Sequence, residues 1–130
     1  MKQTALILII SLAATLSQAA GFAIEGNWGT HQSANGIDFD VTFAIQNQHL
    51  VLTNVCSFQG QTAVAQVSVA VTYTDSTFNV LESAANTNSS GGLDCNASVQ
   101  GGDQMQYQVQ GSTLIFTKPG QPGTLVFFRK

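Results

Sequence analysis

The chain has 130 residues, of which only 8% are charged, and its formal net charge at pH 7 is −3. Its Lys and Arg residues number four, too few to neutralise many phosphates, so the composition argues against nucleic acid as a partner. The length fits one domain with a single hydrophobic core.

The first 19 residues have the three-part layout of a secretory signal peptide. Lys2 precedes an apolar run over residues 5–14, and Ser17-Gln18-Ala19 offers a small-x-small cleavage site after Ala19, with a cut after Ala20 as the alternative. The apolar run is shorter than the about 20 residues that a membrane-spanning helix needs. We therefore expect a cleaved signal at residues 1–19, a single domain at residues 20–130, and a secreted or periplasmic location without a membrane span.

Period-two alternation, the pattern of half-buried strands, replaces helical periodicity after the signal. Apolar residues occupy the odd positions of 37–45, and Ala, Val and the final Tyr73 occupy those of the long segment 62–73. The segment 86–94, NTNSSGGLD, has the composition of a flexible loop. The expected strands cover residues 26–30, 37–45, 49–58, 62–73, 77–85, 95–100, 104–110, 113–117 and 124–129.

Short strands joined by tight turns predict an all-β fold. Successive hairpins favour an antiparallel up-and-down β-barrel of about eight strands, because closure removes the exposed edges of an open sheet. The two cysteines, Cys56 and Cys95, are predicted to form a disulfide, because an even cysteine count in an exported chain is typical of one. The alternative is a catalytic thiol or a metal-binding pair, and it is disfavoured because neither cysteine lies in a C-x-x-C motif or has a histidine nearby.

Residues near the two ends of the domain carry a family resemblance. Gly26-Asn27-Trp28 forms a G-x-W motif on the first strand, and Arg129 closes the last strand. With the penultimate hairpin, residues 107–114, they resemble the calycin superfamily, that is, the lipocalins and their short bacterial lipocalin-like relatives. The resemblance implies that Gly26, Trp28 and Arg129 close one end of the barrel, with the guanidinium packed over the indole. The mouth would then lie at the end away from Trp28.

The same features are also similar to those of small periplasmic inhibitors of metalloproteases. These proteins share an eight-stranded barrel, a disulfide, a G-x-W-like start and an aromatic-then-Arg finish, and they inhibit through a free N-terminal arm. In this chain the corresponding arm, Ala20 to Ile24, would be short.

Catalytic and metal-binding chemistry find little support in the residues. No serine or cysteine lies in a recognisable nucleophile motif that could act with His31 or His49. We therefore expect both histidines to be solvated and the protein not to be an enzyme. Asp38 and Asp40 alternate with apolar residues, which favours an outward, solvated face over a calcium or acid–base site. We expect no metal and no cofactor.

The leading hypothesis is an exported, monomeric, calycin-like barrel that binds a small hydrophobic ligand. An eight-stranded barrel either fills its interior with side chains or holds one small ligand. The alternatives are an inhibitor whose partner is a protease, and a non-catalytic structural or adhesive surface module. The predicted ligand-binding residues are Phe39, Val41, Phe43, Val67, Val69, Tyr107 and Phe116.

Overall fold

The computed structural model describes residues 22–130, so the expected signal peptide and its cleavage site lie outside the described residues. The described chain is built from ten strands and turns. The strands are β1 (Gly26–Ala34), β2 (Ile37–Gln46), β3 (His49–Phe58), β4 (Gln61–Tyr73), β5 (Thr77–Val80), β6 (Ala84–Ser90), β7 (Leu93–Val99), β8 (Gln104–Gln110), β9 (Thr113–Thr117) and β10 (Leu125–Arg129).

Eight of these strands close into an antiparallel barrel in the order β1-β10-β9-β8-β5-β4-β3-β2. The all-β barrel that the sequence predicts is thereby confirmed. The barrel closes where β1 pairs with β10, with Trp28 opposite Arg129. It departs from a simple meander at one point, because β5 pairs with β8 while β6 and β7 form a separate two-stranded sheet.

The prediction of a flexible loop at residues 86–94 is wrong. This segment forms most of the β6–β7 hairpin, with Gly91 and Gly92 as its two-residue turn. Both glycines have positive φ angles, 56° and 86°, as a type I′ hairpin turn requires. The Asn, Ser and Gly residues that suggest a loop therefore serve as strand and turn residues of a hairpin.

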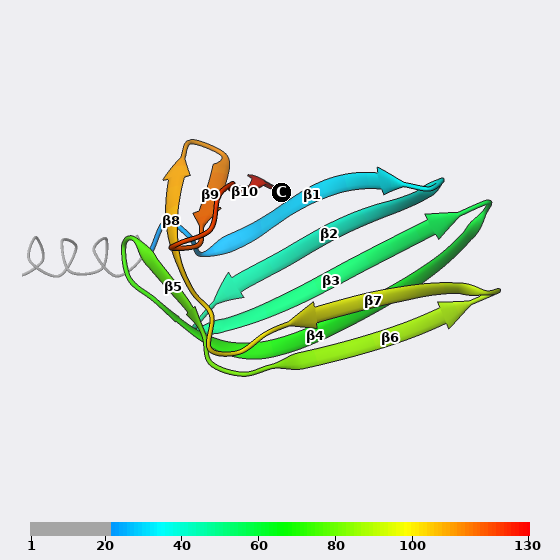
Figure 1. Ribbon diagram of the computed structural model, residues 1–130, viewed down its shortest axis with the longest axis horizontal. Coiled ribbons are helices and arrows are strands. Elements are labelled where there is room, and N and C mark those ends of the chain that lie inside the picture. Colours follow the sequence, from blue (N-terminus) through cyan, green and yellow to red (C-terminus); the bar gives the residue numbers. More distant parts are fainter. Residues whose placement is uncertain (1–21) are drawn as a thin grey trace, which may run out of the picture.

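The β6–β7 hairpin lies along β3 and β4, where the long strands β1 to β4 run on past the barrel (Figure 1). Cys95 of β7 forms the predicted disulfide with Cys56 of β3, with Cα atoms 5.7 Å apart. The hairpin is thereby attached covalently to the sheet that it covers.

Two hydrophobic cores result from this arrangement. The barrel core is buried inside the closed sheet and consists of Ile24, Trp28, Phe43, Ile45, Leu50, Val69, Val71, Phe78, Val80, Tyr107, Leu114 and Phe116. The hairpin core fills the space between the β6–β7 hairpin and strands β3 and β4, and it consists of Cys56, Ala63, Ala65, Val67, Leu93, Cys95 and Ala97. The odd positions of β4 serve both cores, as the period-two pattern predicts. No helix that could cross a membrane occurs in the stretch from residue 22 to residue 130.

Candidate functional site: the open end of the barrel

The closed end of the barrel is organised around Trp28, which is fully buried. The Arg129 guanidinium carbon lies 4.1 Å from the centre of the Trp28 ring, which is the predicted contact. A guanidinium over an indole face is attracted by the ring quadrupole. The contact adds a side-chain tie to the backbone pairing of β1 with β10.

The segment just before β1 crosses this end and forms its floor. Trp28 Nε1 donates a hydrogen bond to the Ile24 carbonyl at 2.8 Å. The Arg129 Nη1 and Nη2 atoms donate to the carbonyls of Glu25 and Ala23 at 3.3 and 3.2 Å. Three backbone carbonyls of residues 23–25 are thus held by two side chains.

Gly26 is needed at the start of β1 for two reasons. Its φ angle is +132°, which L residues with a side chain rarely adopt. A Cβ atom at this position would also lie 2.6 Å from Arg129 Nη1. The glycine of the G-x-W motif therefore leaves space for the arginine that packs on the tryptophan.

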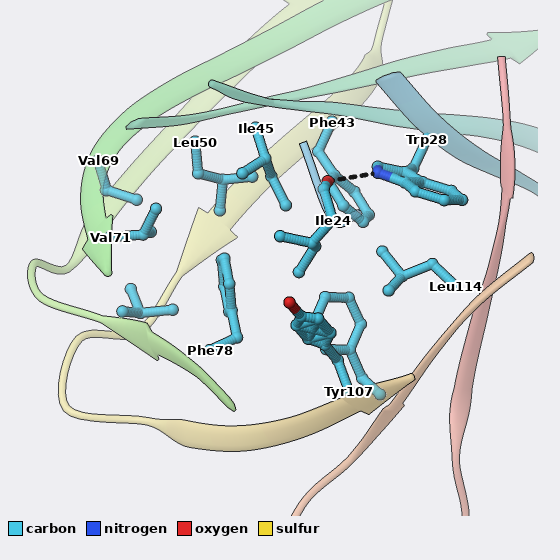
Figure 2. Packing of buried hydrophobic residues seen from close by; sticks show 12 residues of the cluster. Ile24, Trp28, Phe43, Ile45, Leu50, Val69, Val71, Phe78, Tyr107 and Leu114 are labelled. Atoms are coloured by element: carbon cyan, nitrogen blue, oxygen red, sulfur yellow. Dashed lines mark hydrogen bonds between the residues drawn. The ribbon is translucent and has the colours of Figure 1, made fainter. Parts of the chain in front are cut away.

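The Ile24 side chain is fully buried and fills the closed end of the barrel among Trp28, Leu114 and Tyr107 (Figure 2).

Two tyrosine hydroxyls form hydrogen bonds near this end. The Tyr107 hydroxyl donates to the Thr74 carbonyl, and burial raises the pKa of Tyr107. The Tyr73 hydroxyl donates to Glu25 Oε2 at 2.6 Å, and burial together with this carboxylate raises the pKa of Tyr73.

An apolar cavity of about 140 Å³ lies at the other end of the barrel. None of the floor residues Ile24, Trp28, Tyr107 and Leu114 lines it. It opens to solvent beside Leu125, whose residue exposure is 57%. All of its lining residues are apolar: Phe43, Leu50, Leu52, Phe78, Val80, Met105, Phe116, Leu125 and Phe127.

Four phenylalanine rings dominate this lining and contact one another. Phe116 is the common member, with ring centres 6.1 Å from Phe43, 5.5 Å from Phe78 and 5.9 Å from Phe127. Phe43 and Phe127 meet edge to face at 4.6 Å. These rings come from β2, β5, β9 and β10, so residues distant in sequence build one aromatic wall.

A second, partly polar hollow of about 310 Å³ adjoins the cavity, and we call it the vestibule. The two spaces share Met105, Phe116 and Leu125 as lining residues. The vestibule is walled by the loop that joins β9 to β10 and by an ion pair. Lys118 Nζ lies 3.0 Å from Asp103 Oδ1, and both side chains are partly exposed.

The predicted ligand-binding residues divide among three places. Phe43 and Phe116 line the cavity, whereas Val69 and Tyr107 belong to the barrel core without lining it. The other three lie elsewhere: Val67 is in the hairpin core, Phe39 packs against that core, and the half-buried Val41 belongs to neither core.

The sequence analysis missed most of the cavity lining, for example Leu52, Phe78, Met105, Leu125 and Phe127. Strand alternation does place each of these on the inner face. The missing information was which end of each strand reaches the mouth, and that depends on the register between strands.

The residues set aside as catalytic candidates lie on the surface. His31, Asp38 and His49 are exposed and Asp40 is half-buried. His31 Nε2 lies 3.8 Å from Asp38 Oδ1, and Lys130 Nζ lies 3.6 Å from Asp40 Oδ1. In the described part of the chain no three His, Cys, Asp or Glu residues are grouped so that they could hold a metal ion.

The fold defines a closed eight-stranded antiparallel β-barrel and a disulfide-linked hairpin, which packs on the face of β3 and β4 that also lines the barrel. Such a barrel fits a calycin-like fold in general terms. Comparison of the chain with protein-family models, with curated proteins and with solved structures finds no match.

Proposed function

We propose that this protein is an exported, calycin-like barrel that binds one small apolar molecule at its open end. The observation that supports the proposal most directly is the cavity lined only by apolar side chains, at the end opposite the packed floor. Ligand sites in proteins are typically concave and largely apolar, with a few polar groups nearby that fix orientation. The vestibule with its Lys118–Asp103 pair supplies such groups.

The volume of the cavity limits the size of the ligand. An apolar cavity of about 150 Å³ is enough to bind benzene, and this cavity measures about 140 Å³. Sites for drug-sized molecules are larger, about 300–1,000 Å³. The cavity therefore suits a single ring or a short branched chain, and a long lipid would not fit inside it.

The packing of the floor favours a ligand carrier over an inhibitor with a free N-terminal arm. The carbonyls of Ala23, Ile24 and Glu25 are hydrogen-bonded to Arg129 and Trp28, and the Ile24 side chain is fully buried. An inhibitory arm made of these residues would have to break all of these contacts before it could enter a protease.

Binding can be tested with fluorobenzene, observed through the linewidth of its fluorine signal during titration with the folded protein. We expect saturable broadening that toluene reverses by competition. Absence of saturable broadening in protein that is folded by circular dichroism would overturn the proposal.

Two neighbouring residues of β10 provide the variant and its control. Leu125 lines the cavity, whereas Val126 is the next residue along the strand and points to the opposite face. Both are exposed, at 57% and 37%, so substitution of either leaves the buried core intact. We expect Leu125→Asp to weaken fluorobenzene binding at least about tenfold, because it places a carboxylate against an apolar guest, and Val126→Asp to leave it unchanged. Equal effects of the two variants would place any binding outside the cavity.

A further inference from the structure

The charged groups that line the vestibule form one neutral pair, with Gln121 and Thr124 as the uncharged polar residues of the same lining. Lys118 Nζ lies 3.0 Å from Asp103 Oδ1, so one ammonium and one carboxylate stand side by side at the vestibule. Met105, Phe116 and Leu125 line both the cavity and the vestibule. A ring held in the cavity could therefore extend a substituent past these shared residues into the vestibule that the ion pair lines.

The charges of the pair select among possible substituents. An anionic group would meet the Asp103 carboxylate beside the lysine, and a cationic group would meet the Lys118 ammonium beside the aspartate. A hydroxyl group suits both partners, because it can donate one hydrogen bond to a carboxylate and accept another from an ammonium. Hydrogen bonds to charged groups are also stronger than those between neutral groups.

The aromatic wall of the cavity favours an aromatic ring as the apolar part of the ligand. The rings of Phe43, Phe78, Phe116 and Phe127 form a connected set with centres 4.6 to 6.1 Å apart. Aromatic pairs at such separations gain attraction from their quadrupoles beyond the area that they bury. A flat guest ring can join this set, whereas a saturated ring of similar size gains only the burial of its surface.

We propose that the ligand class of this barrel is a small neutral phenol: one aromatic ring in the cavity, with a hydroxyl group that bridges Lys118 and Asp103. This proposal rests on the proposed function, since it assumes that the cavity is the binding site. Beyond the proposed function, it specifies that the apolar part of the ligand is an aromatic ring and that its polar group is a hydroxyl.

A matched ligand series tests the two parts of the proposal by NMR titration or calorimetry. The series consists of p-cresol, toluene, 4-methylcyclohexanol, the anion p-toluate and the cation 4-methylbenzylammonium. We expect p-cresol to bind about tenfold more tightly than toluene, because it gains hydrogen bonds to charged groups. We expect it to bind about two- to tenfold more tightly than 4-methylcyclohexanol, because it gains the ring contacts. Both charged ligands should bind more weakly than p-cresol.

Variants of the ion pair locate the hydroxyl site. Lys118→Met and Asp103→Asn should each reduce the preference for p-cresol over toluene while leaving toluene binding within about twofold, because toluene touches only the apolar wall. Lys130→Met is the control, since Lys130 contacts Asp40 on the outer face of the sheet. This variant should change the affinity for neither p-cresol nor toluene.

The outcomes separate this proposal from the proposed function. If toluene binds but p-cresol shows no preference, or if the preference survives both ion-pair variants, the phenol assignment is wrong and the apolar site stands. If p-toluate or the cation binds most tightly, the bridging hydroxyl is likewise wrong. If none of the five compounds binds the folded protein, the proposed function and this inference fail together.

Discussion

Arg129 connects the two ends of the domain through three separate contacts. Its guanidinium packs on the Trp28 ring and donates hydrogen bonds to the carbonyls of Ala23 and Glu25. These partners lie about a hundred residues earlier in the chain. The planar, permanently charged guanidinium can stack and donate at once, which a lysine ammonium on a flexible stem cannot do.

We expect Arg129→Lys to reduce the free energy of unfolding by about 1–2 kcal/mol, since the variant keeps the charge but loses the stacking and one of the two donors. The neighbouring Lys130→Met should cost less than about 0.5 kcal/mol, because the Lys130 side chain forms an exposed ion pair and the substitution keeps the backbone hydrogen bond to Asn27. Urea denaturation followed by far-ultraviolet circular dichroism measures both. Equal midpoints for the two variants would show that the Arg129 contacts do not stabilise the closure.

The Trp28–Arg129 contact is implied by the family resemblance, whereas the role of Ile24 is not indicated by the sequence. The G-x-W motif and the closing arginine carry that resemblance, while Ile24 precedes the first strand and looks like part of a free arm. Its burial follows from the chain turning under the barrel, where Glu25 N donates to the Phe22 carbonyl at 3.0 Å. A local pattern cannot show this, because part of the surface that buries Ile24 comes from Tyr107 of β8 and Leu114 of β9, near the far end of the chain.

At the scale of elements, the β6–β7 hairpin shows why a polar strand can be mistaken for a loop. The Asn86 and Asn88 side chains donate to the carbonyls of Gln66 and Val64 on β4. These carbonyls point away from β3, on the part of β4 that β5 does not reach. Polar side chains of β6 thus supply hydrogen-bond donors to an edge of β4 that no strand of the described chain pairs with. A search for alternating hydrophobic residues does not detect strands that pack in this way.

We expect the double variant Asn86→Ala/Asn88→Ala to expose this edge of β4. Two lost hydrogen bonds should cost about 1–3 kcal/mol, and an unpaired strand edge promotes pairing with another chain. Thr87→Ala is the control, because Thr87 bonds Asn96 within the hairpin. Sedimentation velocity over a range of concentrations should show self-association for the double variant and a monomer for the control. A double variant that stays monomeric with unchanged stability would contradict this account of the edge.

At the scale of the whole molecule, the two cores differ in what holds them together. The barrel core contains tryptophan, tyrosine and phenylalanine rings, whereas the hairpin core is built mainly from alanine, valine and cysteine. Smaller side chains bury less apolar area, and the stabilisation from burial scales with that area. The hairpin core therefore depends more heavily on its covalent link, the Cys56–Cys95 disulfide. Leu52, Ala84 and Val99 pack against both cores and couple them.

The Cys56→Ala/Cys95→Ala variant should consequently lose cooperativity as well as stability. Closing a loop of 39 residues contributes about 4 kcal/mol in the chain-entropy model. We expect the hairpin to detach first on addition of urea, while the barrel remains closed around Trp28. Hydrogen exchange of the β6 and β7 amides should then rise at urea concentrations where the fluorescence of Trp28, the single tryptophan, is still native. In the oxidised protein the same two measurements should report one shared transition. Coincident transitions in the cysteine-free variant would instead mean that Leu52, Ala84 and Val99 suffice to join the two cores into one cooperative unit.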